Sequence, residues 1–382
     1  MKLISKNLTK KIAALMTAAA IFPSALILPA KAEAFNLGGA IGGAVVAGAQ
    51  AQQVGAQIDY FDDQGRDEFY QDMKNSYGVN DDPVLNAKVD ELMVNLTAGV
   101  GAIDPTIYDK PYNYFINTDT SFNAFCSLGH NISINTGLFD MVDNMDEVAV
   151  VIAHEIGHGQ KEHVKKGFKK GTTLSVIAAG IGGGSSVGIA VATSILANQV
   201  KAHNVTKPQE READALAFDY LVNTPYNLGA TAAIWQRVLD KSGNSKSDFL
   251  GAIFSPNDHP GHIERRDTYA KTLSAYSNNA VTVADGTVSV NGKPVFTPVD
   301  VEEMSGAERS YFIAGRLARL YHGANPSALT AVAEGSSVYV GDTLIFTASE
   351  DDESAETIAA SLNEAHKLPT PANNKDKKKK KK

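Results

Sequence analysis

The stretch "VAVVIAHEIGHGQ" carries two histidines four residues apart, with a glutamate directly after the first. On an α-helix, His154 and His158 differ by about 40° in direction and about 6 Å along the axis, so both imidazoles can face one ion. Zinc binds histidine nitrogens at about 2.0–2.1 Å in a tetrahedral set and lowers the pKa of a coordinated water to about 7. Glu155 is suited to take a proton from that water. The H-E-x-x-H spacing therefore predicts a zinc site that catalyses hydrolysis.

A further ligand is expected on a second helix, in "TKPQEREADALAFDYL". Glu210 and Asp214 are four residues apart and share one face of this helix. We expect Glu210 to bind zinc and Asp214 to hold a ligand histidine by its second ring nitrogen. Glu212 lies about 200° around the helix from Glu210 and should face away, although Glu212 or a ligand not evident in the sequence is the alternative. His163 lies about 180° around the first helix from the first histidine and is expected to point elsewhere.

The two motifs together resemble a known family. "DEVAVVIAHEIGH" with "EREAD" is similar to the zinc peptidases that include the CAAX prenyl proteases, the HtpX membrane proteases and the exported BepA-like proteases. Their pattern is H-E-x-x-H followed by E-x-x-x-D, which implies Glu210 as the third ligand, with Thr206 and Lys207 replacing the family's Ser and Arg. The resemblance covers roughly residues 60–275. It implies an α+β, mostly helical zincin-type metalloprotease domain with a small edge β-sheet.

Two more stretches extend this resemblance. "NAF" with "ISINTGLF" is similar to the family's edge strand and turn before the metal helix, so Asn123, Ala124 and Phe125 are expected to pair with a substrate as an added strand. His130 stands where the family often has glycine, and its role is open.

"DHPGHIERR" resembles the family's His-Pro segment that ends in Arg, with His259, Pro260 and Arg265 as the matching residues. This implies that His259 lies over the zinc as a regulatory cap or oxyanion helper. An ordinary loop histidine is the alternative. His262 has no counterpart in the family.

The composition of both chain ends predicts segments that lie outside the folded domains. Residues 1–34 have the basic, apolar and small-residue regions of a secretory signal peptide, with an uncleaved membrane anchor as the alternative. Removing the five lysines and one glutamate of 1–34, and the seven lysines and one aspartate of 375–382, leaves 23 basic and 41 acidic residues. An acidic body argues against nucleic-acid binding as the main role. Cys126 is the only cysteine, which excludes an intramolecular disulfide and is expected to be a buried structural thiol.

The middle of the chain predicts the remaining organisation. We expect short strands within 112–139 and one continuous helix from about 144 to 170. The uncharged stretch 171–200 is long enough to span a membrane, but its six glycines and its "GGGSS" break favour a buried or membrane-touching hairpin over the active site. No internal repeat is evident. The predicted units are a signal peptide at 1–34, a Gly/Ala-rich leader at 35–56, a zinc metallopeptidase domain at 57–277, a small C-terminal α+β module at 278–368 and a Lys-rich disordered tail at 369–382.

The expected function is that of an exported zinc-dependent metalloendopeptidase, with one zinc per chain, that hydrolyses peptide bonds of envelope proteins in the periplasm. The resemblance implies a role in protein quality control, and misfolded envelope proteins are the expected substrates. The apolar segment 171–200 is expected either to shield the cleft or to contact a membrane. One alternative is a chaperone-like assembly factor that binds clients in the cleft with little proteolysis. The other is a membrane-embedded processing protease.

Overall fold

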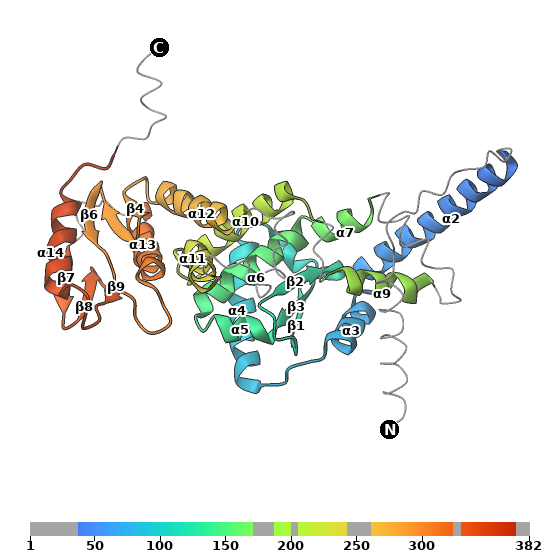
Figure 1. The fold of residues 1–382 in the computed structure, drawn as a ribbon, viewed down its shortest axis with the longest axis horizontal. Coiled ribbons are helices and arrows are strands. Elements are labelled where there is room, and N and C mark those ends of the chain that lie inside the picture. The colour runs from blue at the N-terminus through green and yellow to red at the C-terminus, as the bar shows by residue number, and fades with distance from the viewer. Residues whose placement is uncertain (1–36, 171–186, 200–204, 243–260, 324–329, 372–382) are drawn as a thin grey trace, which may run out of the picture. The chain divides into compact units, whose positions relative to one another are not determined.

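The computed structural model describes residues 37–170, 187–199, 205–242, 261–323 and 330–371. Residues from Ala49 onward form one compact unit, distinct from Met1–Gly48. The described elements are mostly helices, accompanied by three small three-stranded sheets (Figure 1). This confirms the predicted mostly helical α+β fold.

The candidate site stands on two helices that pack along each other. Helix α6 (Met145–Gln160) begins at Asn144, whose side chain accepts a hydrogen bond from the Asp146 amide at 2.9 Å. Helix α10 (Lys207–Val222) begins with a capping box in which Thr206 and Gln209 cap each other. Gly157 allows the two helices to approach closely. A Cβ at this position would lie only 3.2 Å from the Cα of Ala213.

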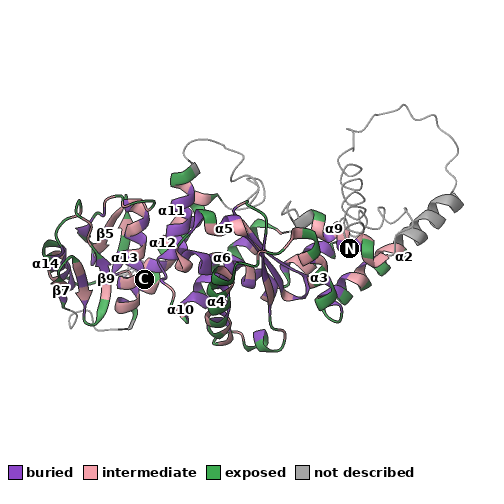
Figure 2. Ribbon diagram, turned by 90° about the horizontal axis from the view of Figure 1, so that it is seen from below, coloured by how far each residue is buried: buried purple, intermediate pink, exposed green. Residues whose placement is uncertain are grey.

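A three-stranded sheet lies beside α6. Its order is β1–β3–β2, with β1 (Asn113–Asn117) parallel to β3 (Asn131–Asn135) and β2 (Ala124–Ser127) antiparallel to β3. The 3-10 turn η2 (Leu128–His130) joins β2 to β3, and α5 (Thr136–Met141) leads from β3 toward α6. Strand β2 is thus an edge strand that packs against α6. Figure 2 shows that α6 and this sheet are largely buried.

The predicted continuous helix from 144 to 170 is wrong at one point. Helix α6 ends at Gln160, Glu162 has left-handed backbone angles with φ 52°, and a short helix α7 (His163–Phe168) follows. The chain therefore turns before His163, which changes the direction of that side chain.

The amino-terminal helices are α2 (Leu37–Asp62), α3 (Arg66–Tyr77) and α4 (Pro83–Gly101), followed by the 3-10 turn η1 (Pro105–Tyr108). Helices α2 and α3 pack against the sheet, whereas α4 packs against α6 and α10. A separate apolar cluster joins α2, α3, the sheet and helix α9 (Val187–Gln199), and it includes Phe125 of β2. The Tyr77 hydroxyl donates to the carbonyl of Leu196 at 2.7 Å, which ties α9 to α3. The rest of the predicted 171–200 hairpin lies outside the described residues, and among the helices that are described none is both long and apolar enough to cross a membrane.

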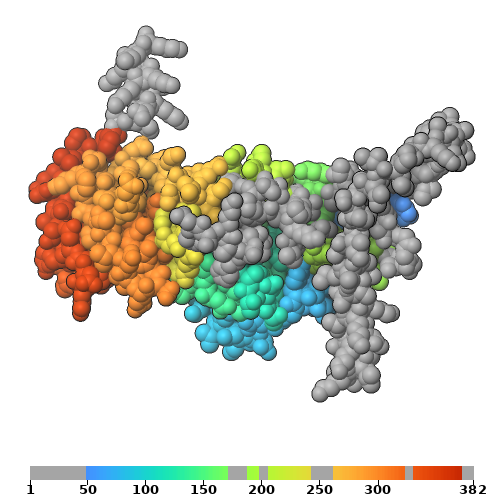
Figure 3. Space-filling view, in the orientation of Figure 1, coloured from blue at the N-terminus to red at the C-terminus, as the bar shows by residue number. Residues whose placement is uncertain are grey.

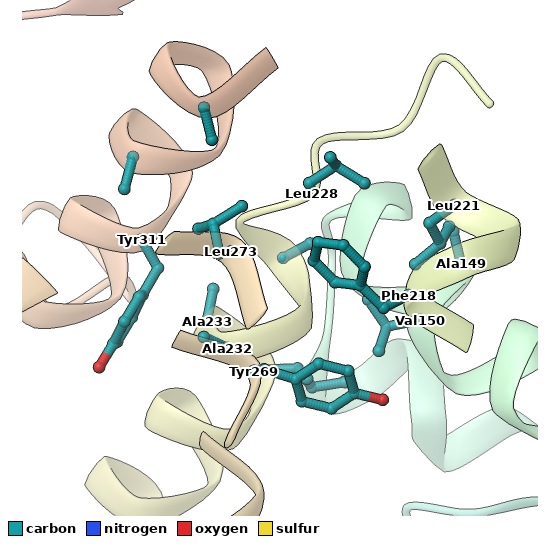
Figure 4. Close-up of a cluster of buried hydrophobic side chains, with 14 of the residues drawn as sticks. Ala149, Val150, Phe218, Leu221, Leu228, Ala232, Ala233, Tyr269, Leu273 and Tyr311 are labelled. Carbon is teal, nitrogen blue, oxygen red and sulfur yellow. The ribbon is translucent and has the colours of Figure 1, made fainter. Parts of the chain in front are cut away.

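The main core joins α6 and α10 to α11 (Ala230–Ser242) and α12 (His262–Tyr276). Figure 4 shows part of it, where Val150 and Phe218 lie near Tyr269 and Leu273. Tyr311 of the next helix packs at the border of this cluster, so the residues after α12 share the same core.

The C-terminal part contains a duplication that the sequence did not reveal. A sheet of β4 (Val281–Ala284), β5 (Thr287–Val290) and β6 (Lys293–Phe296) precedes α13 (Gly306–Gly323). A sheet of β7 (Ala331–Glu334), β8 (Ser337–Val340) and β9 (Thr343–Thr347) precedes α14 (Ala355–His366). All three strands of the second unit begin 50 residues after their counterparts, and the register shifts at Val288/Ser289 and Val338/Tyr339 correspond. The equivalent rings of Phe296 and Phe346 stack with centroids 4.9 Å apart.

Helix α13 docks the first of these units onto α10 and α11. The Arg319 guanidinium donates to the carbonyls of Leu221, Val222, Thr224 and Tyr226, at 2.7–2.9 Å, and so satisfies the C-terminal end of α10. A Cβ on Gly229 would lie 1.9 Å from the Tyr311 carbonyl oxygen, so this contact requires glycine. In the space-filling view of Figure 3, the yellow surface of the α11 region meets the orange surface of the residues that follow.

Candidate active site

His154, His158 and Glu210 come together between α6 and α10. All three side chains are buried, and one ligand atom from each lies within 4.8 Å of the others. The Nε2 atoms of the two histidines are 3.0 Å apart, and each lies 3.4 Å from a carboxylate oxygen of Glu210. These are the three side chains that the sequence motifs predicted as metal ligands.

These separations fit a tetrahedral metal site. Zinc bonds of about 2.0–2.1 Å in a tetrahedron place ligand atoms about 3.3 Å apart, close to the three observed distances. Two imidazoles and one carboxylate are also a donor set that suits zinc and leaves a fourth position open for catalysis. The described residues therefore fit a catalytic metal.

His154 is held from behind by a buried network. Its Nδ1 lies 2.9 Å from Oδ1 of Asp214 and 3.2 Å from Nη2 of Arg265, and the shorter contact with the acceptor Asp214 favours a proton on Nδ1, while Nε2 faces the ligand cluster. Asp214 is paired in turn with Arg265 of α12, and it accepts a hydrogen bond from the Tyr269 hydroxyl at 3.1 Å. The guanidinium of Arg265 stacks on the Trp235 ring at 3.7 Å from its centroid. The spacing of Asp214 predicted its place beside a ligand histidine. Tyr269 and Trp235 belong to no recognisable motif, so their part in this network was not predicted.

Charge in this network shifts several pKa values. Burial and the nearby Arg265 act to lower the pKa of His154, but the hydrogen bonds that its ring donates to Asp214 and Glu210 outweigh them and raise the pKa to about 9. Burial, followed by the repulsion of the neighbouring His154, holds the pKa of His158 well below its usual value. Burial acts to raise the pKa of Asp214, yet Arg265 and His154 keep it below the ordinary range. The metal-free cluster therefore favours a charged His154 between two carboxylates.

Glu155 is turned toward the edge strand. Its Oε2 accepts a hydrogen bond from the Cys126 amide of β2 at 2.8 Å, and its side chain is partly buried. Burial is the largest cause that raises the pKa of Glu155 to about 7. A carboxyl group with this pKa can both accept and return a proton near neutral pH.

The edge of β2 that turns away from β3 lies next to Glu155. The amide of Asn135 donates to the Asn123 carbonyl at 3.0 Å, so the backbone N–H and C=O groups of Asn123 and Phe125 point toward β3. Because these directions alternate along an antiparallel strand, the backbone groups of Ala124 and Cys126 point away from β3. The Cys126 thiol is free and buried, as predicted. A small pocket beside this edge is lined by residues that include Cys126, His130, His158 and Lys165.

Three of the sequence candidates take other positions. His163 contacts His158 on the side away from His154 and Glu210, with the Nδ1 atoms of the two rings 3.0 Å apart. Glu212 faces away from Glu210, as expected, and lies 3.2 Å from Nε2 of His163. His130 stacks on Tyr112 with centroids 4.4 Å apart, and burial lowers its pKa to about 4. His259 lies outside the described residues, so its predicted role as a cap stays a prediction.

Fold and site together define a metallopeptidase with an H-E-x-x-H helix and a glutamate as the third residue of the cluster. A family model described as peptidase family M48 matches residues 83–280, which is just over half of the chain. The chain belongs to peptidase family M48.

Similar proteins carry names of the same class. The chain is 26% identical over 189 residues to a putative beta-barrel assembly-enhancing protease of Vibrio cholerae, and the match covers 46% of this chain and 37% of that protein. It is 29% identical over 189 residues to the metalloprotease LoiP of Escherichia coli, with 48% and 72% covered. It is 23% identical over 190 residues to the beta-barrel assembly-enhancing protease of Escherichia coli, with 46% and 37% covered. The matches thus span little more than a third of the two assembly-enhancing proteases.

Proposed function

We propose that this chain is an exported, zinc-dependent endopeptidase that cleaves unfolded envelope proteins in the periplasm as part of quality control. The observation that carries the proposal is the convergence of two histidines and a glutamate beside a partly buried Glu155 at the edge of a sheet. Family membership and the names of the similar proteins support peptide hydrolysis and an envelope setting. The signal-like residues 1–34 support export.

The chemistry follows from the positions of the side chains. His154, His158 and Glu210 would hold zinc, which when bound polarises the scissile carbonyl and makes a water molecule easier to deprotonate. Glu155, with its pKa near neutrality, takes the proton of the attacking water and returns it to the leaving amine. Asp214 keeps His154 in the tautomer whose Nε2 faces the cluster.

The substrate would be bound as an extended strand along β2. The outward N–H and C=O groups of Ala124 and Cys126 offer a peptide the hydrogen bonds of one more strand. A peptide that pairs with Cys126 displaces the Glu155 carboxylate from its amide, which releases this base for the water. Only a segment with unpaired backbone groups can bind in this way, which favours unfolded proteins over folded ones.

The proposal is tested with one substrate in two states. A β-barrel membrane protein kept unfolded in dilute urea should be cut by the wild-type protein, and the same barrel folded in detergent should resist. Glu155→Gln should remove cleavage, whereas Glu91→Gln, at an exposed position on α4, should leave it unchanged. Cleavage that survives Glu155→Gln would refute the assigned base, and equal cleavage of both states would refute the preference for unfolded chains.

Export has its own test. In a Gram-negative host, the mature protein should appear in the periplasmic fraction with an amino terminus directly after Ala32 or Ala34. An intact amino terminus in the cytoplasm would contradict this part of the proposal.

A further inference from the structure

The chain bends sharply between the metal helix and the residue that follows it. Glu162 has a φ of 52°, in the left-handed region that residues with a side chain rarely adopt. The bend ends α6 and begins α7 with His163, whose side chain is buried. A continuous helix would have carried His163 to the opposite face from His154. The backbone strain at Glu162 therefore has a definite result, which is the position of the His163 ring.

That ring connects a metal-site histidine to a carboxylate on the other helix. Nδ1 of His163 lies 3.0 Å from Nδ1 of His158, and the two rings meet edge to face with centroids 5.0 Å apart. Nε2 of His163 lies 3.2 Å from Oε2 of Glu212 on α10. The three groups form a chain from the cluster to the surface, because Glu212 is half exposed.

The protons of this chain can be placed from its geometry. Nε2 of His158 faces Glu210 and His154, so a metal would bind at that atom, and the neutral ring must carry its proton on Nδ1. His158 Nδ1–H then donates to Nδ1 of His163. The proton of His163 is left on Nε2, from which it donates to the Glu212 carboxylate.

We infer that His163 and Glu212 are positioning residues that fix the tautomer and orientation of His158 for metal binding, as Asp214 does for His154. This inference rests on the proposed function and extends it to residues outside the ligand set. Helix α10 would then serve both histidines, since Asp214 holds one directly and Glu212 holds the other through His163. His154 is thus held directly by the buried carboxylate of Asp214, whereas His158 is held only indirectly, through His163, by the half-exposed carboxylate of Glu212.

A purely structural role for His163 gives a different expectation. In that case the contact between His163 and Glu212 would only tie α7 to α10, and its loss would lower the thermal stability of the metal-free protein without changing the metal site. Zinc affinity and the visible spectrum of the cobalt-substituted protein separate the two roles, because both depend on how the ligands are oriented.

The test compares His163→Phe, which keeps a ring but removes both nitrogens, with Glu212→Gln. Zinc dissociation constants from competition with a chelator should rise by about 10–100-fold in His163→Phe and by less in Glu212→Gln. The double variant should bind zinc no more weakly than His163→Phe alone, because Glu212 acts only through His163. The matched control is Glu264→Gln, whose carboxylate is equally exposed and is paired with Arg211 on the same helix α10. It should bind zinc like the wild type.

The cobalt absorption bands should shift in His163→Phe and stay unchanged in Glu264→Gln. Wild-type zinc affinity and an unchanged cobalt spectrum in a folded His163→Phe protein would overturn the inference, even if the variant melts earlier. Additive losses in the double variant would overturn the relay through His163. Failure of the wild type to bind zinc would instead refute the proposed function, so the two failures are distinguishable.

Discussion

Replacing Arg237 with methionine should strongly destabilise the protein although the site is not touched. Arg237 of α11 is 3% exposed and pairs with two buried carboxylates, Glu308 of α13 at 2.7 Å and Glu147 of α6 at 3.3 Å. Its Nη1 also donates to the Met141 carbonyl at 3.3 Å. The cluster therefore connects the first turn of the metal helix to the first C-terminal repeat.

The magnitude follows from burial. Removing one partner of a buried ion pair costs about 3–5 kcal/mol, because the remaining charges stay away from water without compensation. Arg237→Met leaves two such carboxylates, so we expect a loss of about 3–5 kcal/mol in the free energy of unfolding. Changing Glu147 and Glu308 to leucine in the same protein should recover most of this loss, since an apolar group needs no partner.

The assay is urea denaturation of the metal-free protein, followed by tryptophan fluorescence and circular dichroism. The matched control is Lys241→Met on the same helix, whose pair with Glu303 is at the surface at 3.4 Å and should contribute at most about 1 kcal/mol. A loss below about 1 kcal/mol in Arg237→Met, or equal losses in both variants, would refute the stabilising role of the buried cluster of Arg237, Glu147 and Glu308.

Further predictions concern pH, helix packing and the duplicated units. Burial raises the pKa of Glu147 to about 8 and that of Glu308 to about 7, above the ordinary 4.5, so the folded state binds more protons than the unfolded state. The melting temperature should therefore fall as the pH rises from about 5 to 8. Glu308→Gln should make this fall in melting temperature shallower, and an equally steep fall in the variant would contradict the assignment. Gly157→Val should separate α6 from α10 and weaken zinc binding measured by chelator competition, because a Cβ already meets Ala213 at 3.2 Å; unchanged affinity would count against the close contact. Phe346→Ala should cost about 3–5 kcal/mol in urea denaturation, since its ring fills the interface with Phe296; a loss under about 1 kcal/mol would show that the two units do not share this core.

Short-range spacing predicted much of the site. An i, i+4 repeat is enough to place His154 with His158, and Glu210 with Asp214, on single helix faces, and the structure has these side chains together. The family pattern supplied the pairing of the two helices, which spacing alone could not. The fold class was likewise predictable from the helical patterns between the short strands.

What escaped prediction depends on contacts or backbone turns that spacing does not encode. His163 was assigned to the far face because no residue pattern indicated the left-handed backbone at Glu162. The role of Tyr269 depends on how α12 packs on α10. The duplication was missed because its evidence lies in equal element order and a constant offset, while the side chains agree at few positions such as Phe296 and Phe346.

The central claim is that His154, His158 and Glu210 hold a catalytic zinc for which Glu155 is the base. It is tested most directly by measuring zinc content and casein cleavage side by side for the wild type, Glu155→Gln and Glu210→Ala. The account predicts one zinc and cleavage in the wild type, zinc without cleavage in Glu155→Gln, and loss of both in Glu210→Ala. A wild-type protein that binds no zinc, or a Glu210→Ala protein that binds zinc and cuts as well as the wild type, would contradict it.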